Sequence, residues 1–174
     1  MEQCEYHVVL VEAAKLSAAD QEICIGVIGS GDAVDVESAR RELPKASAIA
    51  VVHSENQIVG VGAIKRRRVE YATKISEDAH FKFPAETLEL GYVAVVGPAH
   101  RGHGLSHKLV AALLAGRNEA LFATTSSEPM KKALRKAGFD LQGQEWDGND
   151  SRLSLWVRQA SSEPETLTVR SGRD

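Results

Sequence analysis

The sequence predicts an α/β protein, with a mixed sheet flanked by helices, and three observations support this prediction. The 174 residues are 43% hydrophobic, which suits one domain with a proper core. Short β-rich runs and segments with apolar residues at helical spacing follow one another along the chain. Residues 88–96 form a nearly continuous apolar run, which indicates a buried central strand.

The first half of the chain begins with a strand, continues with two helices and ends in a hairpin. Ser17 is a suitable N-cap for the first helix, and Pro44 ends the second. Residues 66–87 are polar and predict a long connection or an extended strand end; long connections are often functional. The predicted elements of this half are a strand at 6–11, helices at 17–28 and 35–43, and strands at 47–53 and 57–65.

The second half is organised around strand 88–96, which ends at Gly97-Pro98 because proline donates no ladder hydrogen bond. A glycine-rich loop at 101–104 leads into a helix at 105–115. Residues 161–174 are polar with few large apolar side chains and predict a frayed tail. The remaining predicted elements are a strand at 120–125, a helix at 128–137 ended by Gly138, and strands at 139–144 and 152–158 around a turn at 147–150.

Composition and charge argue against several classes of protein. No apolar run is long enough to span a bilayer, and the acidic, polar start of the chain does not have the pattern of a signal peptide. The two cysteines, Cys4 and Cys24, form neither a disulfide framework nor a metal cluster, so we expect a reducing cytoplasm. The net charge of −3 argues against a general nucleic-acid-binding protein but is compatible with a local basic patch.

The loop after the central strand has the features of a phosphate site. Gly102 and Gly104 let backbone N–H groups converge on an anion, and the following helix N-terminus adds unpaired donors and partial positive charge. The spacing fits neither a Walker loop nor a Gly-x-Gly-x-x-Gly fingerprint. The alternative is an ordinary glycine turn. His100, His103 and His107 lack metal-ligand spacing, so we expect them beside the phosphates and predict no metal site.

The pattern Arg101-x-x-Gly104-x-Ser106, after Val-x-x-Pro98, resembles the pyrophosphate loop of the GNAT superfamily of N-acetyltransferases. The predicted order βααβββαβαββ is that of the GNAT fold, so the resemblance covers one domain at about 5–158, with 159–174 as a flexible tail. It implies that acetyl-CoA is the cofactor. It also implies that the pyrophosphate is held by Arg101, Gly102, His103, Gly104, Leu105 and Ser106, although the family prefers Gly or Ala at the position of Ser106.

The resemblance also assigns the pantetheine arm of the cofactor to the backbone of strand 88–96. In the family the cofactor lies where the fourth and fifth strands splay apart, and one N–H group faces the thioester carbonyl. The corresponding residues here are Val95 and Val96. Either valine can correspond to the family's valine. If Val95 is the reference, the chain has one residue more before Pro98 than the usual Val-x-Pro spacing, so two registers remain open.

Acetyl transfer to an amine needs a base for the amine's proton and donors for the oxyanion. Glu89 is the candidate base, because some family members place a glutamate six residues before the strand's valine, and Glu89 stands six before Val95. The alternative is a glutamate at a strand edge that faces water. If Val96 sets the register, Glu89 falls out of place and Tyr92 becomes the more interesting residue.

The departing thiolate must be protonated or tolerated. Leu134 stands where the family has its tyrosine acid, and Ser127 stands where it often has an asparagine. Tyr92 or the hydroxyls of residues 125–127 are the available substitutes, and the thiolate could also leave without help.

We therefore expect an N-acetyltransferase that moves an acetyl group directly from acetyl-CoA to a primary amine of a small molecule or peptide. One alternative is a non-catalytic acyl-CoA-binding or sensory module, suggested by the missing tyrosine. Another is a toxin-like enzyme that acetylates aminoacyl-tRNA, suggested by the basic run Lys65–Arg68, although such runs are usually solvated strand ends. We expect no membrane association. Homodimers are common in the family, and the sequence leaves the acceptor open.

Overall fold

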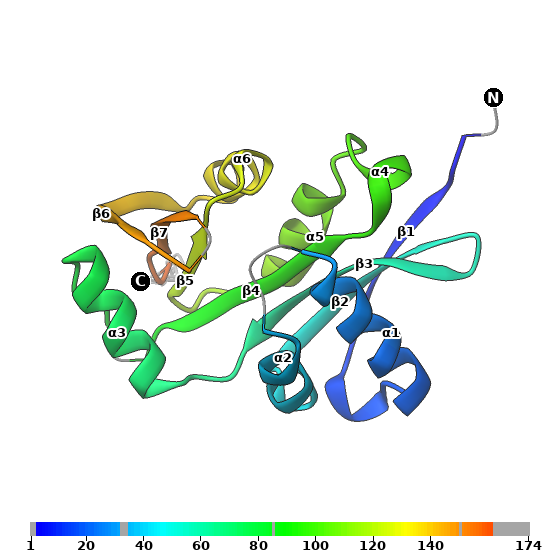
Figure 1. Ribbon diagram of the computed structural model, residues 1–174, viewed down its shortest axis with the longest axis horizontal. Helices are drawn as coiled ribbons and strands as arrows, with labels where there is room; N and C mark the ends of the chain where they lie inside the picture. The colour runs from blue at the N-terminus through cyan, green and yellow to red at the C-terminus, as the bar shows by residue number, and fades with distance from the viewer. Residues whose placement is uncertain (1–2, 32–34, 85, 150, 162–174) are drawn as a thin grey trace, which may run out of the picture.

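The computed structural model describes residues 3–31, 35–84, 86–149 and 151–161. Its centre is a seven-stranded mixed sheet with strand order β1-β2-β3-β4-β5-β7-β6 (Figure 1). Neighbouring strands are antiparallel, except that β4 and β5 are parallel. The strands are β1 (Tyr6–Val11), β2 (Ala48–Ser54), β3 (Gln57–Lys65), β4 (Leu88–Val95), β5 (Leu121–Thr125), β6 (Asp140–Asp147) and β7 (Arg152–Arg158).

Helices cover both faces of this sheet. The face with Val61, Ala63 and Tyr92 packs against α1 and α2, whereas the face with Ile64 and Leu90 packs against α5 and α6. Helix α3 lies on the same face as α1 and α2. On β5, Leu121 and Ala123 face α5 and α6, whereas Phe122 between them packs against α3. Because side chains alternate along a strand, Phe122 and α3 lie on the opposite face from α5 and α6. The helices are α1 (Ala18–Gly29), α2 (Val36–Glu42), α3 (Val69–Ala79), α4 (Gly97–His100), α5 (Leu105–Leu114) and α6 (Glu128–Lys136), with short 3₁₀ helices η1 (Ala13–Lys15) and η2 (Leu43–Lys45).

The first two helices begin where the sequence places their caps. Ser17 Oγ accepts a hydrogen bond from the Asp20 N–H at 3.1 Å, and Asp35 Oδ1 accepts one from the Glu37 N–H at 3.0 Å. Each cap satisfies an amide that has no partner inside its own helix. Pro44 falls in η2, directly after α2, and so ends the helix as predicted.

The structure corrects the prediction for residues 66–87, which contain helix α3 rather than only a connection or a strand end. The helix forms because Ala72, Ile75 and Ala79 recur at helical spacing and pack against β5 and β7. Polar and basic residues between them hide this pattern in the sequence. A smaller difference concerns Gly97-Pro98, predicted as a turn, which begins the single helical turn α4.

The seven predicted strands and the four predicted helices are present with boundaries within a few residues of those expected. The chain after β7 is described as far as Ser161. Its N–H donates to the Asn118 carbonyl at 3.0 Å, and its hydroxyl donates to Asn118 Oδ1 at 3.0 Å. The predicted tail at 161–174 therefore starts from an anchored residue, and the rest of that prediction, residues 162–174, lies outside the described residues.

Candidate active site

Strands β4 and β5 pair only at their starts and then separate. Strand β4 continues to Val95. The edge of residues 90–95 that faces away from β3 therefore has no strand partner within the described chain. An edge of this kind offers N–H and C=O groups to an extended ligand that carries amides. The two paired positions are Leu88 with Leu121 and Glu89 with Phe122.

A bulge interrupts β4 beside this opening. The pairing register shifts between Val61 and Ala63 of β3, so that Tyr92 and Val93 together stand opposite Gly62. Tyr92 has a φ of 55°, which is rare for a bulky side chain. Strained backbone of this kind clusters at functional sites, where the surrounding structure holds it in place.

Hydrogen bonding at the end of β4 differs between Val95 and Val96, the two residues that the sequence left as alternatives. The Val96 N–H donates to the Val59 carbonyl at 2.8 Å and is therefore engaged with β3. Val95 is paired with Gly60 and lies one residue earlier. Because backbone groups alternate in direction along a strand, the N–H and C=O of Val95 point away from β3, toward the opening.

The glycine loop joins this edge to helix α5. Gly102 and Gly104 have φ values of 80° and 68°, which glycine adopts without strain, and a Cβ at either position would meet open space. Gly104 is the N-cap of α5 and supplies no side-chain cap. The helical hydrogen bonds begin with the Lys108 N–H, which donates to the Gly104 carbonyl at 3.1 Å. The N–H groups at the start of α5, before Lys108, are therefore available to an anion.

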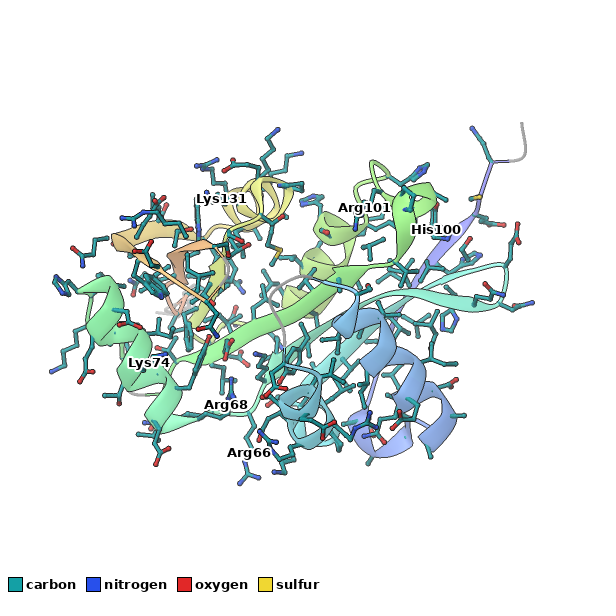
Figure 2. The ribbon with its side chains drawn as sticks, viewed as in Figure 1. Arg66, Arg68, Lys74, His100, Arg101 and Lys131 are labelled. Carbon is teal, nitrogen blue, oxygen red and sulfur yellow. The ribbon has the colours of Figure 1, made fainter. Side chains whose placement is uncertain are left out.

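Two side chains frame this loop. Leu105 is 3% exposed and anchors the first turn of α5 in the core, while Arg101 is exposed beside the loop (Figure 2). The Tyr6 hydroxyl lies 3.1 Å from His100 Nδ1, and the ring of His103 lies 5.2 Å from the Tyr6 ring between centres. The loop is thereby connected to the start of β1.

Glu89 lies at the inner end of the opening and is buried, with 6% of its surface exposed. Lys65 Nζ donates to its Oε1 at 2.9 Å, and Arg68 Nη2 lies 3.4 Å from its Oε2. Both carboxylate oxygens therefore face cations. The alternative expected from the sequence, a glutamate at a strand edge facing water, is wrong.

Tyr92 and Tyr71 complete this cluster. Lys65 Nζ lies 3.9 Å from the centre of the Tyr92 ring and 5.9 Å from that of Tyr71, in cation–π contact. Burial raises the pKa of Tyr92, and it raises the pKa of Tyr71 to about 12, so both hydroxyls are protonated at neutral pH. The Ser38 hydroxyl opposes the rise for Tyr92, yet no described group has hydrogen-bonding geometry to the buried Tyr92 Oη.

Of the other hydroxyls suggested by the sequence, that of Ser126 is exposed, and those of Thr125 and Ser127 have structural partners. Thr125 Oγ1 accepts a hydrogen bond from the Ser127 N–H at 3.0 Å, and Ser127 Oγ caps α6 by accepting from the Met130 N–H at 3.4 Å. Leu134, at the family's tyrosine position, is fully buried in the core. Tyr92 is thus the described candidate acid that has a buried hydroxyl without a partner.

The basic run Lys65–Arg68 divides into two pairs with different surroundings. Arg66 is exposed (Figure 2). Arg67 is exposed as well, as expected for a solvated strand end. Lys65 is 8% exposed and, like Arg68, is directed at Glu89. The prediction of a solvated end is therefore wrong for Lys65 and Arg68. No signal within the run itself distinguishes them, because their partner is supplied by β4.

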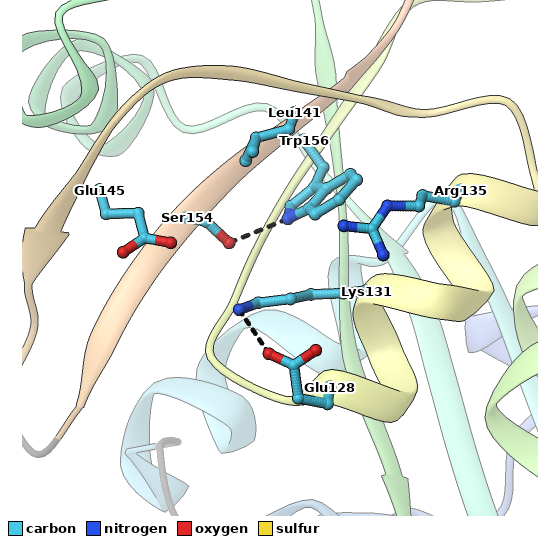
Figure 3. A pocket seen from close by; sticks show the side chains of 7 residues that line it. All are labelled: Glu128, Lys131, Arg135, Leu141, Glu145, Ser154 and Trp156. Carbon is cyan, nitrogen blue, oxygen red and sulfur yellow. Dashed lines mark hydrogen bonds and ion pairs between the residues drawn. The ribbon is translucent and has the colours of Figure 1, made fainter.

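A pocket of about 110 Å³ lies apart from this cluster, between α6 and the β6–β7 hairpin (Figure 3). Lys131 pairs with Glu128 at 2.9 Å, and Trp156 Nε1 donates to Ser154 Oγ at 2.9 Å. The Arg135 guanidinium lies 5.0 Å from the Trp156 ring centre. No lining residue of this pocket has a buried polar atom without a partner, in contrast to the Tyr92 hydroxyl, so we place the candidate active site at β4.

Comparison with known proteins identifies the fold. No family model matches the chain, and no curated protein matches it by sequence. Among solved structures, an acetyltransferase of the GNAT family from Streptococcus agalactiae is 14% identical, with a TM-score of 0.63 over 90% of this chain and 96% of its own. ElaA from Escherichia coli is 10% identical, with a TM-score of 0.60 over 89% of this chain and all of its own.

A third structure, yncA from Salmonella typhimurium, was solved with its cofactor acetyl-CoA. It is 18% identical, with a TM-score of 0.57 over 93% of this chain and 99% of its own. These matches, together with the mixed sheet, show that the chain has the GNAT acyl-CoA N-acyltransferase fold. The predicted fold class is confirmed, with α3 as an additional helix between β3 and β4.

None of the helices in the described ranges has both the length and the apolar character needed to cross a bilayer.

Proposed function

We propose that this protein is an acyltransferase that moves an acetyl group from acetyl-CoA to a primary amine. The observation that carries the proposal is the continuity between the free edge of β4 and the anion-binding loop at the start of α5. Coenzyme A combines an amide-containing arm with a pyrophosphate, and these two features suit the two halves of this surface. The acetyl-CoA held by yncA, which shares the fold, is consistent with the proposal.

The residues of the chain fit this cofactor. The open space at Gly102 and Gly104 lets the backbone approach a pyrophosphate, and the amides of Leu105 and Ser106 are free to donate to it. Arg101 adds a cation beside the loop. The backbone of Val95 faces the opening and suits the amides of the pantetheine arm. Acetyl-CoA would supply the activated acetyl thioester.

The cluster at the inner end of the opening supplies groups for proton transfer. Glu89 is the proposed base, because its carboxylate is held at the point where β4 and β5 separate. Tyr92 is the proposed acid, because burial raises the pKa of its hydroxyl and leaves that hydroxyl protonated without a partner. The acceptor is a primary amine of a small molecule or peptide.

Calorimetric titration with acetyl-CoA tests the proposal directly. The wild type should bind in the micromolar range, roughly −8 kcal/mol. Arg101→Glu removes the loop's cation and Gly104→Val strains a residue with φ of 68°, so both variants should lose at least about tenfold in affinity. Arg67→Glu is the matched control, since it reverses an exposed charge outside the loop and should bind like the wild type. A folded wild type that does not bind acetyl-CoA contradicts the proposal.

A second measurement separates an enzyme from an acyl-CoA-binding module. The protein is mixed with acetyl-CoA and a panel of small amines, peptides and aminoacyl-tRNA, and release of the free thiol is followed. An acetyltransferase releases thiol with at least one amine, and Glu89→Gln lowers that rate. Tight binding without thiol release by any amine would favour the non-catalytic module.

A further inference from the structure

The side chain of Lys65 crosses the face of β4 at Gly91 to reach Glu89. A Cβ at Gly91 would lie 2.6 Å from Lys65 Cε and 3.1 Å from its Nζ, so only glycine leaves room for this path. Gly91 is not one of the residues with a positive φ, and its backbone therefore does not itself require glycine. The reason for a glycine at position 91 is instead the space that the Lys65 side chain occupies.

Burial gives this contact a consequence for the charge of Glu89. A carboxylate removed from water tends to take up a proton unless cations or hydrogen-bond donors stabilise its charged form. A general base must be unprotonated before it can accept a proton. Lys65 is the closer of the two cations, at 2.9 Å compared with 3.4 Å for Arg68, and it is also the more deeply buried.

We propose that Lys65 is a positioning residue for Glu89, whose ammonium, laid across Gly91, keeps the carboxylate ionised and directed at the inner end of the opening between β4 and β5. This inference rests on the proposed role of Glu89 as the base. The Lys65 ammonium contacts the Glu89 carboxylate and lies over the rings of Tyr71 and Tyr92, and it acts through the carboxylate.

The surroundings of the pair are balanced between charges from several elements. Burial lowers the pKa of Lys65, and the Glu89 carboxylate opposes this effect. Arg68 lowers the pKa of Lys65 further, whereas Glu42 on α2 raises it. Removing Lys65 would therefore leave Glu89 with one cation at a longer distance. The charged or titratable groups that act on the pair are Arg68 at the N-cap of α3, Tyr71 on α3, Tyr92 on β4 and Glu42 on α2.

Carboxyl ¹³C NMR tests the proposal without any need for an acceptor. Protein labelled at the glutamate side-chain carboxyl is titrated with acid, and the Glu89 signal is assigned by its absence in Glu89→Gln. In Lys65→Met the titration midpoint should move upward by about 1 to 3 pH units relative to the wild type. Lys65→Arg, which restores a cation, should return the midpoint toward the wild-type value.

Gly91→Ala provides a sharper variant, because it keeps both charged groups and displaces only the flexible end of Lys65. Its midpoint should also move upward, by less than in Lys65→Met. Gly60→Ala is the matched control. Gly60 lies near the other end of β3 from Lys65, and its added Cβ would meet Val52 of β2 at 3.2 Å, so the Glu89 midpoint should stay at the wild-type value. If Lys65→Met fails to fold, Gly91→Ala decides the question.

An unchanged midpoint in the folded Lys65 and Gly91 variants would overturn the proposal. With an acceptor in hand, the acid limb of the kcat/KM profile should move with the NMR midpoint, and a limb that stays fixed would overturn it as well. Failure of the proposed function is visible separately, as absence of acetyl-CoA binding in the wild type. The titration needs no cofactor, so the two failures are distinguishable.

Discussion

The hydroxyl of Tyr6 lies 3.1 Å from Nδ1 of His100, a residue 94 positions later in the chain. This hydrogen bond joins the edge strand β1 to the segment between β4 and α5. The ring of His103 also packs against Tyr6, at 5.2 Å between centres. The proposed pyrophosphate loop is therefore supported by a strand that is remote from it in sequence.

Tyr6→Phe should weaken acetyl-CoA binding while leaving the fold intact. The substitution removes one hydrogen bond but keeps the ring against His103, so the loop loses part of its support. A net hydrogen-bond energy of about 0.5 to 1.5 kcal/mol corresponds to a loss of affinity of about 2- to 10-fold in calorimetry. His7→Ala, on the same strand but exposed, is the control and should bind normally. Equal affinities for wild type and Tyr6→Phe would show that Tyr6 does not support the loop.

Tyr92→Phe should be more stable and less active than the wild type. Its buried hydroxyl has no hydrogen-bond partner among the described residues, so its removal should stabilise the fold by about 1 kcal/mol in urea unfolding. If the hydroxyl is the acid, thiol release should fall by about 100-fold or more. Tyr71→Phe is the comparison: the Tyr71 hydroxyl is not among the buried groups without a partner in the described chain, so that variant should gain less stability than Tyr92→Phe. Full activity in Tyr92→Phe would remove Tyr92 from the mechanism.

The sheet and the loop could be predicted because their signals are local. The β-branched residues of 57–65 and 88–95 indicate strands wherever they occur, and Gly102 and Gly104 indicate a turn by their position before a helix. Helix α3 escaped prediction because its buried face is narrow, with Ile75 and Ala79 as its fully buried residues. Packing against β5 and β7, which the sequence of α3 does not encode locally, stabilises it.

The environment of Glu89 could not be predicted for a different reason. The sequence marks Glu89 as a candidate base, but its partner depends on the register that places Lys65 opposite it. A shift of one residue in that pairing would turn Lys65 to the other face of the sheet. The bulge at Tyr92 is likewise a property of the β3–β4 pair rather than of either strand alone. The geometry around Glu89 therefore required the structure.

Cys24 should make the fold less stable at alkaline pH. Burial, followed by the charge of Asp20, raises the pKa of its thiol from 9.0 to about 11. The folded state thus keeps the proton that the unfolded state releases above pH 9, so the stabilisation is complete below pH 9 and is lost as the pH rises through 11. The free energy of unfolding of the wild type, measured relative to Cys24→Ala, should fall by up to about 3 kcal/mol across this range.

Two observations check this interpretation of Cys24. Subtracting the Cys24→Ala curve cancels other alkaline groups, including Tyr71, because both proteins contain them. A thiol reagent should modify the exposed Cys4 quickly in the folded protein and Cys24 only on unfolding. A difference curve that stays flat between pH 9 and 11 would contradict the raised pKa.

Gly143→Ala should be strongly destabilising, because this glycine lies where β6 meets the end of α3. Its φ is 66°, and an added Cβ would collide with the backbone carbonyl of Ala79 and lie 3.1 Å from the Phe81 Cβ. Backbone cannot move aside as a flexible side chain can, so we expect a loss of at least about 2 kcal/mol in urea unfolding. Gly26→Ala, in α1 with no atom within 4 Å of the new Cβ, should instead gain about 0.5 to 1 kcal/mol. A wild-type midpoint for Gly143→Ala would mean that α3 does not pack against β6 in solution, and Arg68 and Tyr71 would then lose their support beside Glu89.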